Sequence, residues 1–186
     1  MRKVHYSYLV SVDGFIEGPD GSFEWGEPDP EVHRHFNEME ARFDTHLFGR
    51  RMWELMSGYW PTAADDPDAT PEQVGYAVEW NKGEHIVFST TLTEVSGGAT
   101  LATDSPADVV RELKNRPGKD ISVGGAGLAQ SLFAENLIDE VNLYICPIIV
   151  GGGKPMFAPL AHSVPLRFVG SDVFASGIAL LRYEKA

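Results

Sequence analysis

The stretch ISVGGAGLAQSLF at residues 121–133 predicts a strand that passes through a glycine turn directly into a helix. Ile121 and Val123 alternate as in a strand, and Leu128 and Leu132 are spaced as on one face of a helix. Glycines let a ligand approach the backbone, and a helix N-terminus presents free N–H groups. The stretch therefore predicts either a tight turn that binds nothing or a phosphate cradle formed by Gly124, Gly125, Ala126 and Gly127.

Strand and helix patterns alternate along the chain on both sides of this stretch. Strands are predicted at residues 3–13, 45–48, 85–88 and 140–150, and helices are predicted to start near residues 30, 50 and 106. Two further strands, 166–169 and 178–183, end the chain with no helix between them. This order predicts a three-layer α/β domain, with a mostly parallel central sheet and an antiparallel C-terminal hairpin.

The composition is that of one folded domain over residues 1–186, with 43% hydrophobic residues and a net charge of −12. An acidic surface repels nucleic acid and anionic lipid, so neither is an expected partner. No apolar run reaches the roughly 18 residues of a membrane span and no targeting segment is recognised, so a cytoplasmic protein is expected. The single cysteine, Cys146, lies in an apolar run and is predicted to be a buried free thiol.

Residues 60–81 differ in composition from the rest of the chain. They contain five acidic residues, three prolines and no Lys or Arg. Within them, Thr70-Pro71-Glu72-Gln73 has the pattern of a helix capping box. We predict that this segment is an insertion or lid, and not a domain boundary.

Two further turns carry groups that suit a phosphate. Gly49-Arg50-Arg51 follows a predicted strand, and two guanidinium groups can bind one phosphate, although a solvated helix start is the alternative. Ser89-Thr90-Thr91 follows the next predicted strand, where hydroxyls are well placed for a ligand of an α/β sheet. Simple turn capping is the alternative for the hydroxyls.

The acidic side chains and histidines give weaker signals. Asp29 precedes Pro30 and is the natural N-cap of the first helix, and Asp13 lies in a turn where its carboxylate can accept backbone N–H bonds. His33 and His35 point to different faces of a helix, so no metal site is predicted. A solvated helix face is predicted for Glu31, Glu38 and Glu40.

The ordered set of motifs resembles a known family. It runs from Ser11-x-Asp13-Gly14-x-Ile16 through GRRMWE at 49–54 and FSTTL at 88–92, and ends with VGGA at 123–126, LIDE at 137–140 and PIIVGGG at 147–153. Nearly the whole chain resembles the dihydrofolate-reductase-like superfamily. It looks most similar to stand-alone relatives of the C-terminal reductase domain of the bacterial bifunctional riboflavin-biosynthesis deaminase–reductase, and a three-layer dihydrofolate-reductase-like fold is therefore expected.

This resemblance implies NADPH as the cofactor. The glycine turn would hold the pyrophosphate with Gly124, Gly125, Ala126, Gly127 and Leu128. The adenosine 2′-phosphate would lie on Gly49, Arg50, Arg51, Ser89 and Thr90, and Met52 would contribute only its backbone N–H. Two arginines suit a dianionic 2′-phosphate, so NADP is expected over NAD. The nicotinamide would lie near Ile16 and Trp25.

The substrate side implied by the resemblance is aromatic and apolar, with Trp25, Phe36, Met56 and Trp60 as its lining. Asp13 and Asp29 are the candidate catalytic proton donors. The leading hypothesis is an NADPH-dependent reductase that transfers a hydride to a small pterin-like or ribosylaminopyrimidine-like heterocycle. The alternative is a catalytically inactive module that binds NADP(H) or another nucleotide. A homodimer is expected, but a purely structural dimerisation domain would leave Arg50 and Arg51 unexplained.

Overall fold

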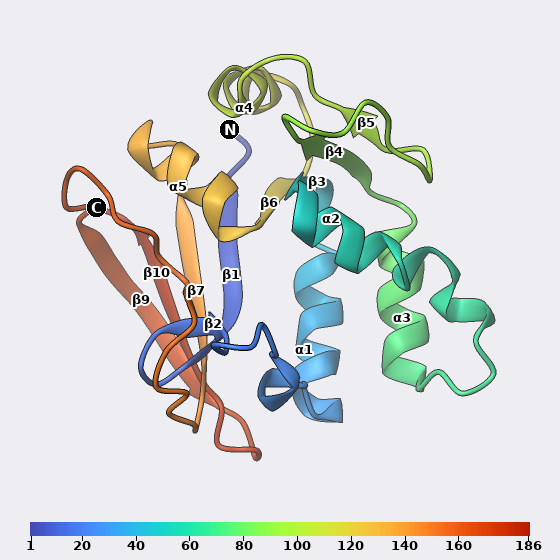
Figure 1. The fold of residues 1–186 in the computed structure, drawn as a ribbon, viewed down its shortest axis with the longest axis vertical. Helices are drawn as coiled ribbons and strands as arrows, with labels where there is room; N and C mark the ends of the chain where they lie inside the picture. The colour runs from blue at the N-terminus through green and yellow to red at the C-terminus, as the bar shows by residue number, and fades with distance from the viewer.

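The computed structural model describes all residues 1–186, and a single eight-stranded sheet runs through it (Figure 1). The strand order is β5-β4-β3-β6-β1-β7-β10-β9. The central strand β1 (Val4–Ser11) pairs in parallel with β6 (Asp120–Gly124) and β7 (Glu140–Cys146). On the far side of β6, the parallel strands are β3 (Phe43–Gly49), β4 (Glu84–Phe88) and β5 (Thr100–Leu101).

The other edge of the sheet is antiparallel. Strand β10 (Ala179–Lys185) runs antiparallel to β7, and β9 (Leu166–Val173) runs antiparallel to β10 and forms the edge. A separate two-stranded ribbon joins β2 (Phe15–Glu17) to β8 (Lys154–Pro155). The predicted parallel sheet with an antiparallel C-terminal hairpin is confirmed.

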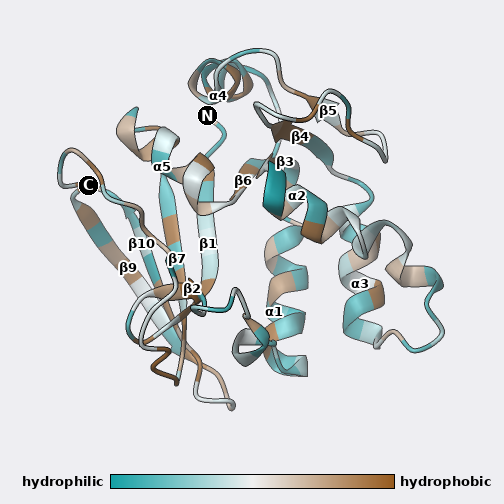
Figure 2. Ribbon diagram, viewed as in Figure 1, coloured by the Kyte–Doolittle hydropathy of each residue, from teal (hydrophilic) through white to brown (hydrophobic).

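Helices cover both faces of the sheet and make the three layers. One face carries α1 (Pro30–Glu40), α2 (Arg50–Ser57) and α3 (Pro71–Trp80), and the other carries α4 (Pro106–Asn115) and α5 (Ala126–Ala134). The short 3-10 helices η1 (Glu24–Gly26) and η2 (Trp60–Asp65) lie in the connections. Teal and brown residues alternate along α1 and α3 in Figure 2, as expected for helices with one face towards the protein.

The segment 60–81 is packed into this architecture. The Thr70 and Gln73 side chains form the predicted capping box, and α3 then places Ala77 and Trp80 in the interior. Trp80 contacts Phe48 of β3 in the same apolar cluster. That the segment works as a lid remains a prediction, but its helix contributes buried side chains to the domain.

The central strand β1 is buried on both faces, because helices cover the sheet on each side. Its apolar alternate residues Val4 and Tyr6 pack towards α5, while His5 and Ser7 lie on the opposite face. The predicted strand at 140–150 ends at Cys146, which is buried and free as expected. None of the helices has the length and hydrophobicity that a bilayer crossing requires.

Candidate active site

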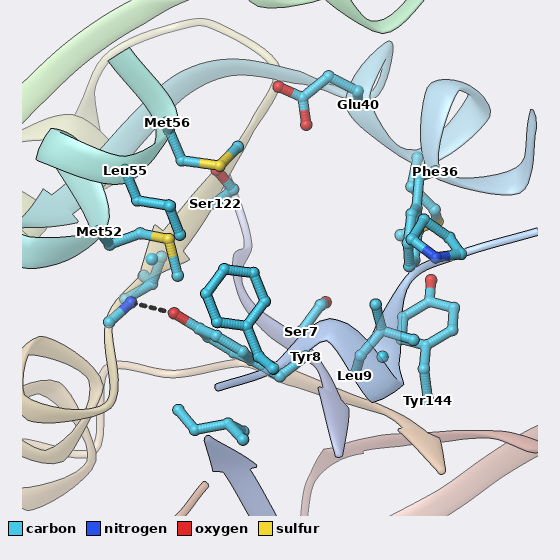
Figure 3. Close-up of a pocket in the computed structure, with 18 of the residues that line it drawn as sticks. Ser7, Tyr8, Leu9, Phe36, Glu40, Met52, Leu55, Met56, Ser122 and Tyr144 are labelled. Atoms are coloured by element: carbon cyan, nitrogen blue, oxygen red, sulfur yellow. Dashed lines mark hydrogen bonds between the residues drawn. The ribbon is translucent and has the colours of Figure 1, made fainter. Parts of the chain in front are cut away.

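A cavity of about 390 Å³ lies between the sheet and the helices α1, α2 and α3. Its floor is made by polar residues of three neighbouring strands, namely His5 and Ser7 of β1, His46 of β3 and Ser122 of β6. Figure 3 shows Ser7 and Ser122 on the strands, with side chains of α1 and α2 across from them. The polar alternate face of the sheet is therefore the floor of a pocket.

The walls of this cavity are mainly aromatic and apolar. All four residues predicted on the substrate side line it, and they are Trp25, Phe36, Met56 and Trp60. Trp60 packs against Tyr76 of α3 with ring centroids 4.3 Å apart, so the 60–81 segment closes one wall. Ile16 of β2 and Met52 of α2 also line the cavity. The structure brings these residues together, and their contact with a substrate or cofactor remains a prediction.

The glycine turn lies at one end of the cavity, where Gly124 and Gly125 are part of its lining. Gly125 has a φ of +115°, a conformation that favours glycine, and a Cβ on Gly124 would lie 2.6 Å from the Phe48 ring. The Gly125 N–H donates to the Tyr8 hydroxyl at 2.6 Å (Figure 3). Burial raises the pKa of Tyr8, so this hydroxyl stays protonated and its hydrogen can be donated.

The helices α5 and α2 begin beside each other at this end of the sheet. A Cβ on Gly125 would lie 3.6 Å from the Gly49 amide nitrogen, and neither N-cap glycine supplies a side-chain cap. The first-turn N–H groups of two helices therefore meet where the cavity opens. Ala126, Gly127 and Leu128 belong to the first turn of α5 and do not line the cavity itself.

Both arginines of the Gly-Arg-Arg turn are exposed and ion-paired. Arg50 pairs with Glu54 at 3.1 Å within α2, and Arg51 pairs with Glu17 of β2 at 3.2 Å. Exposed pairs of this kind contribute little stability, so a bound anion can replace the carboxylates at small cost. The structure thus places two available cations beside the two helix N-termini.

The Ser89-Thr90 turn lies at the C-terminal end of β4, next to the Gly-Arg-Arg turn at the end of β3. Gly49 pairs in register with Phe88, so Ser89 follows directly after the last paired residue of β4. The Ser89 hydroxyl accepts hydrogen bonds from the Thr91 and Leu92 amides at 3.1 and 3.0 Å. It therefore caps its own turn, and neither Ser89 nor Thr90 lines the cavity.

The two candidate proton donors are engaged away from the cavity. The Ser11 hydroxyl, together with the Val150 and Gly151 amides that donate hydrogen bonds to Asp13, lowers the pKa of Asp13 to about 2. Asp29 caps α1 by accepting from the Glu31 and Val32 amides at 2.8 and 2.9 Å. Neither carboxylate lines the cavity. A catalytic role for them remains a prediction that their positions do not support.

The prediction that Glu31, Glu38 and Glu40 form a solvated face of the first helix is wrong for Glu40. Glu31 and Glu38 are exposed, but Glu40 is only 8% exposed and lines the cavity. Since α1 ends at Glu40 and the chain turns back into β3, this last residue points under the helix and not into solvent. Burial raises the pKa of Glu40 to about 8 and lowers that of the neighbouring His46 to about 3.

Several residues that line the cavity were not predicted from the sequence, among them Tyr8, His46, Tyr76 and Ser122. The strand alternation of residues 3–13 does place His5 and Ser7 on one face, and that signal identifies part of the floor. Nothing local connects it to His46 or Ser122, because these strands become neighbours only in the folded sheet. No cluster of three or more metal-ligating side chains is present.

Comparison with known proteins gives consistent matches over the whole chain. The uncharacterized protein YyaP of Bacillus subtilis is 34% identical over 184 residues, which cover 98% of this chain and 95% of YyaP. A crystal structure of a Shewanella sp. PV-4 protein assigned to riboflavin biosynthesis has a TM-score of 0.79 and 25% identity, covering 99% of each chain.

Dihydrofolate reductase from Enterococcus faecalis, solved with NADP(H), has the same fold at lower identity. The TM-score is 0.66 with 15% identity, and the match covers 98% of this chain and 96% of the reductase. This confirms the dihydrofolate-reductase-like architecture. A sequence model of the RibD C-terminal domain family matches residues 2–180. The chain therefore belongs to the RibD C-terminal domain family.

Proposed function

We propose that this protein is an NADPH-dependent reductase that transfers a hydride to a small heterocycle, pterin-like or ribosylaminopyrimidine-like. The observation that carries the proposal is the meeting of two uncapped helix N-termini and two exposed arginines at the mouth of an aromatic cavity. Membership of a reductase-type family supports it, as does the shared fold of a dihydrofolate reductase that was solved with NADP(H).

The residues at the strand ends fit this cofactor. The pyrophosphate would lie on the backbone of Gly124 and Gly125 and on the N–H groups of Ala126, Gly127 and Leu128, where no side-chain cap competes. Arg50 and Arg51 would bind the 2′-phosphate beside Gly49, with Ser89 and Thr90 next to them. When bound, NADPH supplies the hydride.

The chain itself would orient the reactants and exclude water. Ile16 and Trp25 line the side of the cavity nearest β2 and η1, where the nicotinamide would lie. The substrate would lie between Phe36, Met56 and Trp60, whose apolar surfaces suit a planar ring. The partner is therefore a small molecule, and we further expect a cytoplasmic homodimer.

The first test is a thermal-shift titration of the purified protein with NADPH and, separately, with NADH. Binding at a hundredfold excess over Kd adds about 2.7 kcal/mol to the free energy of unfolding. We expect a shift with NADPH and a much smaller one with NADH. The Arg50→Gln and Arg51→Gln variants should lose most of this difference, since the 2′-phosphate loses its cations.

Arg116→Gln is the matched control, because Arg116 is an exposed arginine at the C-cap of α4 and pairs with Glu112 four residues away, as Arg50 pairs with Glu54. It should leave both titrations unchanged. No shift with either nucleotide contradicts the proposal. If NADPH binds but is not oxidised with any pterin or aminopyrimidine tested, the protein is instead the inactive NADP(H)-binding module.

A further inference from the structure

The deep end of the cavity contains a carboxyl group with one oxygen that has no hydrogen-bond partner. Glu40 is the last residue of α1, and Figure 3 shows its carboxyl directed towards Ser122 and Met56. Its Oε1 atom is buried and accepts no hydrogen bond. The His46 Nδ1 atom lies 3.5 Å from this oxygen, and that nitrogen already contacts the Ser122 hydroxyl at 2.7 Å.

Three other polar atoms of the cavity lining are also buried without a hydrogen bond, namely Trp25 Nε1, His33 Nδ1 and His5 Nδ1, of which His5 Nδ1 lies 3.1 Å from Glu140 Oε2. A buried polar group without a partner costs roughly 1–3 kcal/mol, so native proteins keep few of them. Their concentration around one cavity of about 390 Å³ indicates that a bound molecule completes their hydrogen bonds. Trp25 Nε1 can only donate, whereas Glu40 can do both when protonated.

The groups that face Glu40 keep this end of the cavity uncharged near neutral pH. Tyr76 and Glu79 lie on α3 and His46 lies on β3; the Tyr76 hydroxyl favours the ionised carboxylate and Glu79 opposes it. Burial dominates and raises the pKa of Glu40 to about 8. His46 is neutral, since burial and the nearby His85 lower its pKa to about 3.

A protonated carboxyl presents a donor and an acceptor side by side. The complementary partner is a lactam edge, in which a ring N–H lies next to a C=O, because two hydrogen bonds then form in one plane. An ionised carboxylate has two acceptors and leaves the C=O of such an edge unpaired. The chemistry at Glu40 therefore selects a neutral donor–acceptor edge.

The cavity lacks a free cation for a phosphate group. Lys154 is its only Lys or Arg, and its ammonium is paired with Glu17 at 3.0 Å. Glu17 is also the partner of Arg51, so one carboxylate connects the cavity rim to the arginine turn. A phosphorylated substrate would leave its dianion uncompensated at the apolar walls.

We propose that Glu40 is a specificity-determining residue that recognises the lactam edge of an unphosphorylated planar heterocycle at the deep end of the cavity. This assignment rests on the proposed reductase function and names the substrate class for it. The edge pairs with the carboxyl of Glu40 while the ring lies between Phe36 and Met56. The reacting carbon would then lie towards the glycine turn at the opposite end.

The test uses quinolin-2(1H)-one, a fluorescent planar lactam, and N-methylquinolin-2-one, in which the donor is blocked. Neither probe ionises between pH 6 and 10. We expect wild-type protein to bind the parent at least about tenfold more tightly at pH 7, which corresponds to about 1.4 kcal/mol. Glu40→Leu should abolish that preference, and Glu40→Gln should keep it, because an amide also carries one donor side and one acceptor. Glu38→Gln, an exposed change on the same helix, is the control.

The pH profile separates recognition from a structural role. Wild-type affinity for the parent lactam should fall as the pH rises through about 8, and the affinity of Glu40→Gln should stay level. Equal binding of the two probes, no binding of either, or a preference that survives Glu40→Leu would overturn the assignment.

The NADPH thermal shift is measured on the same proteins and keeps the two proposals apart. A wild-type protein that binds NADPH but does not distinguish the probes refutes only the role of Glu40. A wild-type protein that shows no NADPH shift refutes the reductase proposal, whatever the probes do.

Discussion

Single residues of this protein take their chemistry from burial more than from their type. Glu40 and Glu38 lie two positions apart on α1, yet Glu38 is exposed and Glu40 is 8% exposed. Gly125 is likewise defined by its surroundings, since its φ of +115° and its hydrogen bond to Tyr8 fix the glycine turn. Such positions decide what the cavity can bind.

Glu40 should make the stability of the protein depend on pH. Its folded-state pKa of about 8 lies above the ordinary glutamate value of 4.5, so unfolding becomes easier as the pH rises from about 4.5 to about 8. Glu40→Gln removes this dependence. The variant should therefore gain stability over wild type across this range, at roughly 1.4 kcal/mol for each pKa unit of difference.

Urea unfolding of both proteins at pH 5, 7 and 9 measures this gain, with Glu38→Gln as the exposed control. A difference between wild type and Glu40→Gln that stays constant from pH 5 to pH 9 would show that Glu40 is not buried as a neutral acid.

At the scale of elements, α1 connects the rim of the cavity to its deep end. Asp29 caps its first turn and Pro30 occupies the first helical position, while Phe36 and Glu40 line the cavity further along. The helix start is thus encoded locally, and the cap positions every later residue of the helix. Hydrogen bonds from the Val32 amide, the Ser176 hydroxyl and the Glu31 amide lower the pKa of Asp29.

Two substitutions distinguish the role of Asp29 as the helix cap from a role as proton donor. Asp29→Ala should lower the free energy of unfolding by about 1 kcal/mol, because the Glu31 and Val32 amides lose their acceptor. Asp29→Asn retains a good cap and should keep both stability and NADPH oxidation near wild type. If Asp29→Asn folds normally but loses turnover, Asp29 acts as a proton donor after all.

At the scale of the whole molecule, the edge strand β9 presents apolar side chains to solvent. Phe168, Val169 and Val173 are 55%, 49% and 76% exposed. Proteins usually cover such an edge, because an unpaired apolar strand promotes association. This surface agrees with the homodimer that the family resemblance implies.

Light scattering after size exclusion should therefore give about twice the 20.4 kDa of one chain. Phe168→Asp should shift the protein towards the monomer without unfolding it. Val78→Asp removes an exposed apolar residue from α3 and should leave the mass unchanged. A monomeric wild-type protein at micromolar concentration contradicts the dimer.

Much of the architecture follows from local patterns in the chain. Alternation and helical spacing predicted the order of the longer strands and the helices but not the short strands β2, β5 and β8, and the cap at Asp29 and the capping box at Thr70 were both found. Three turns suited to phosphate were also visible, since glycine, arginine and hydroxyl residues cluster directly after predicted strands. The substrate-side residues Trp25, Phe36, Met56 and Trp60 depended on the family resemblance, and all four line the cavity.

The sequence by itself determined which of the longer elements form and in what order, because hydrophobic periodicity and capping act over a few residues. Only the tertiary structure decided which side chains share the cavity, since Glu40, His46 and Ser122 meet through a sheet whose neighbouring strands are distant in sequence. The tertiary structure also decides the protonation state of Glu40. From the sequence, a carboxyl group at a helix end is predicted to be solvated and ionised. It becomes a neutral hydrogen-bond donor only when packing of α3 and the sheet buries it away from water.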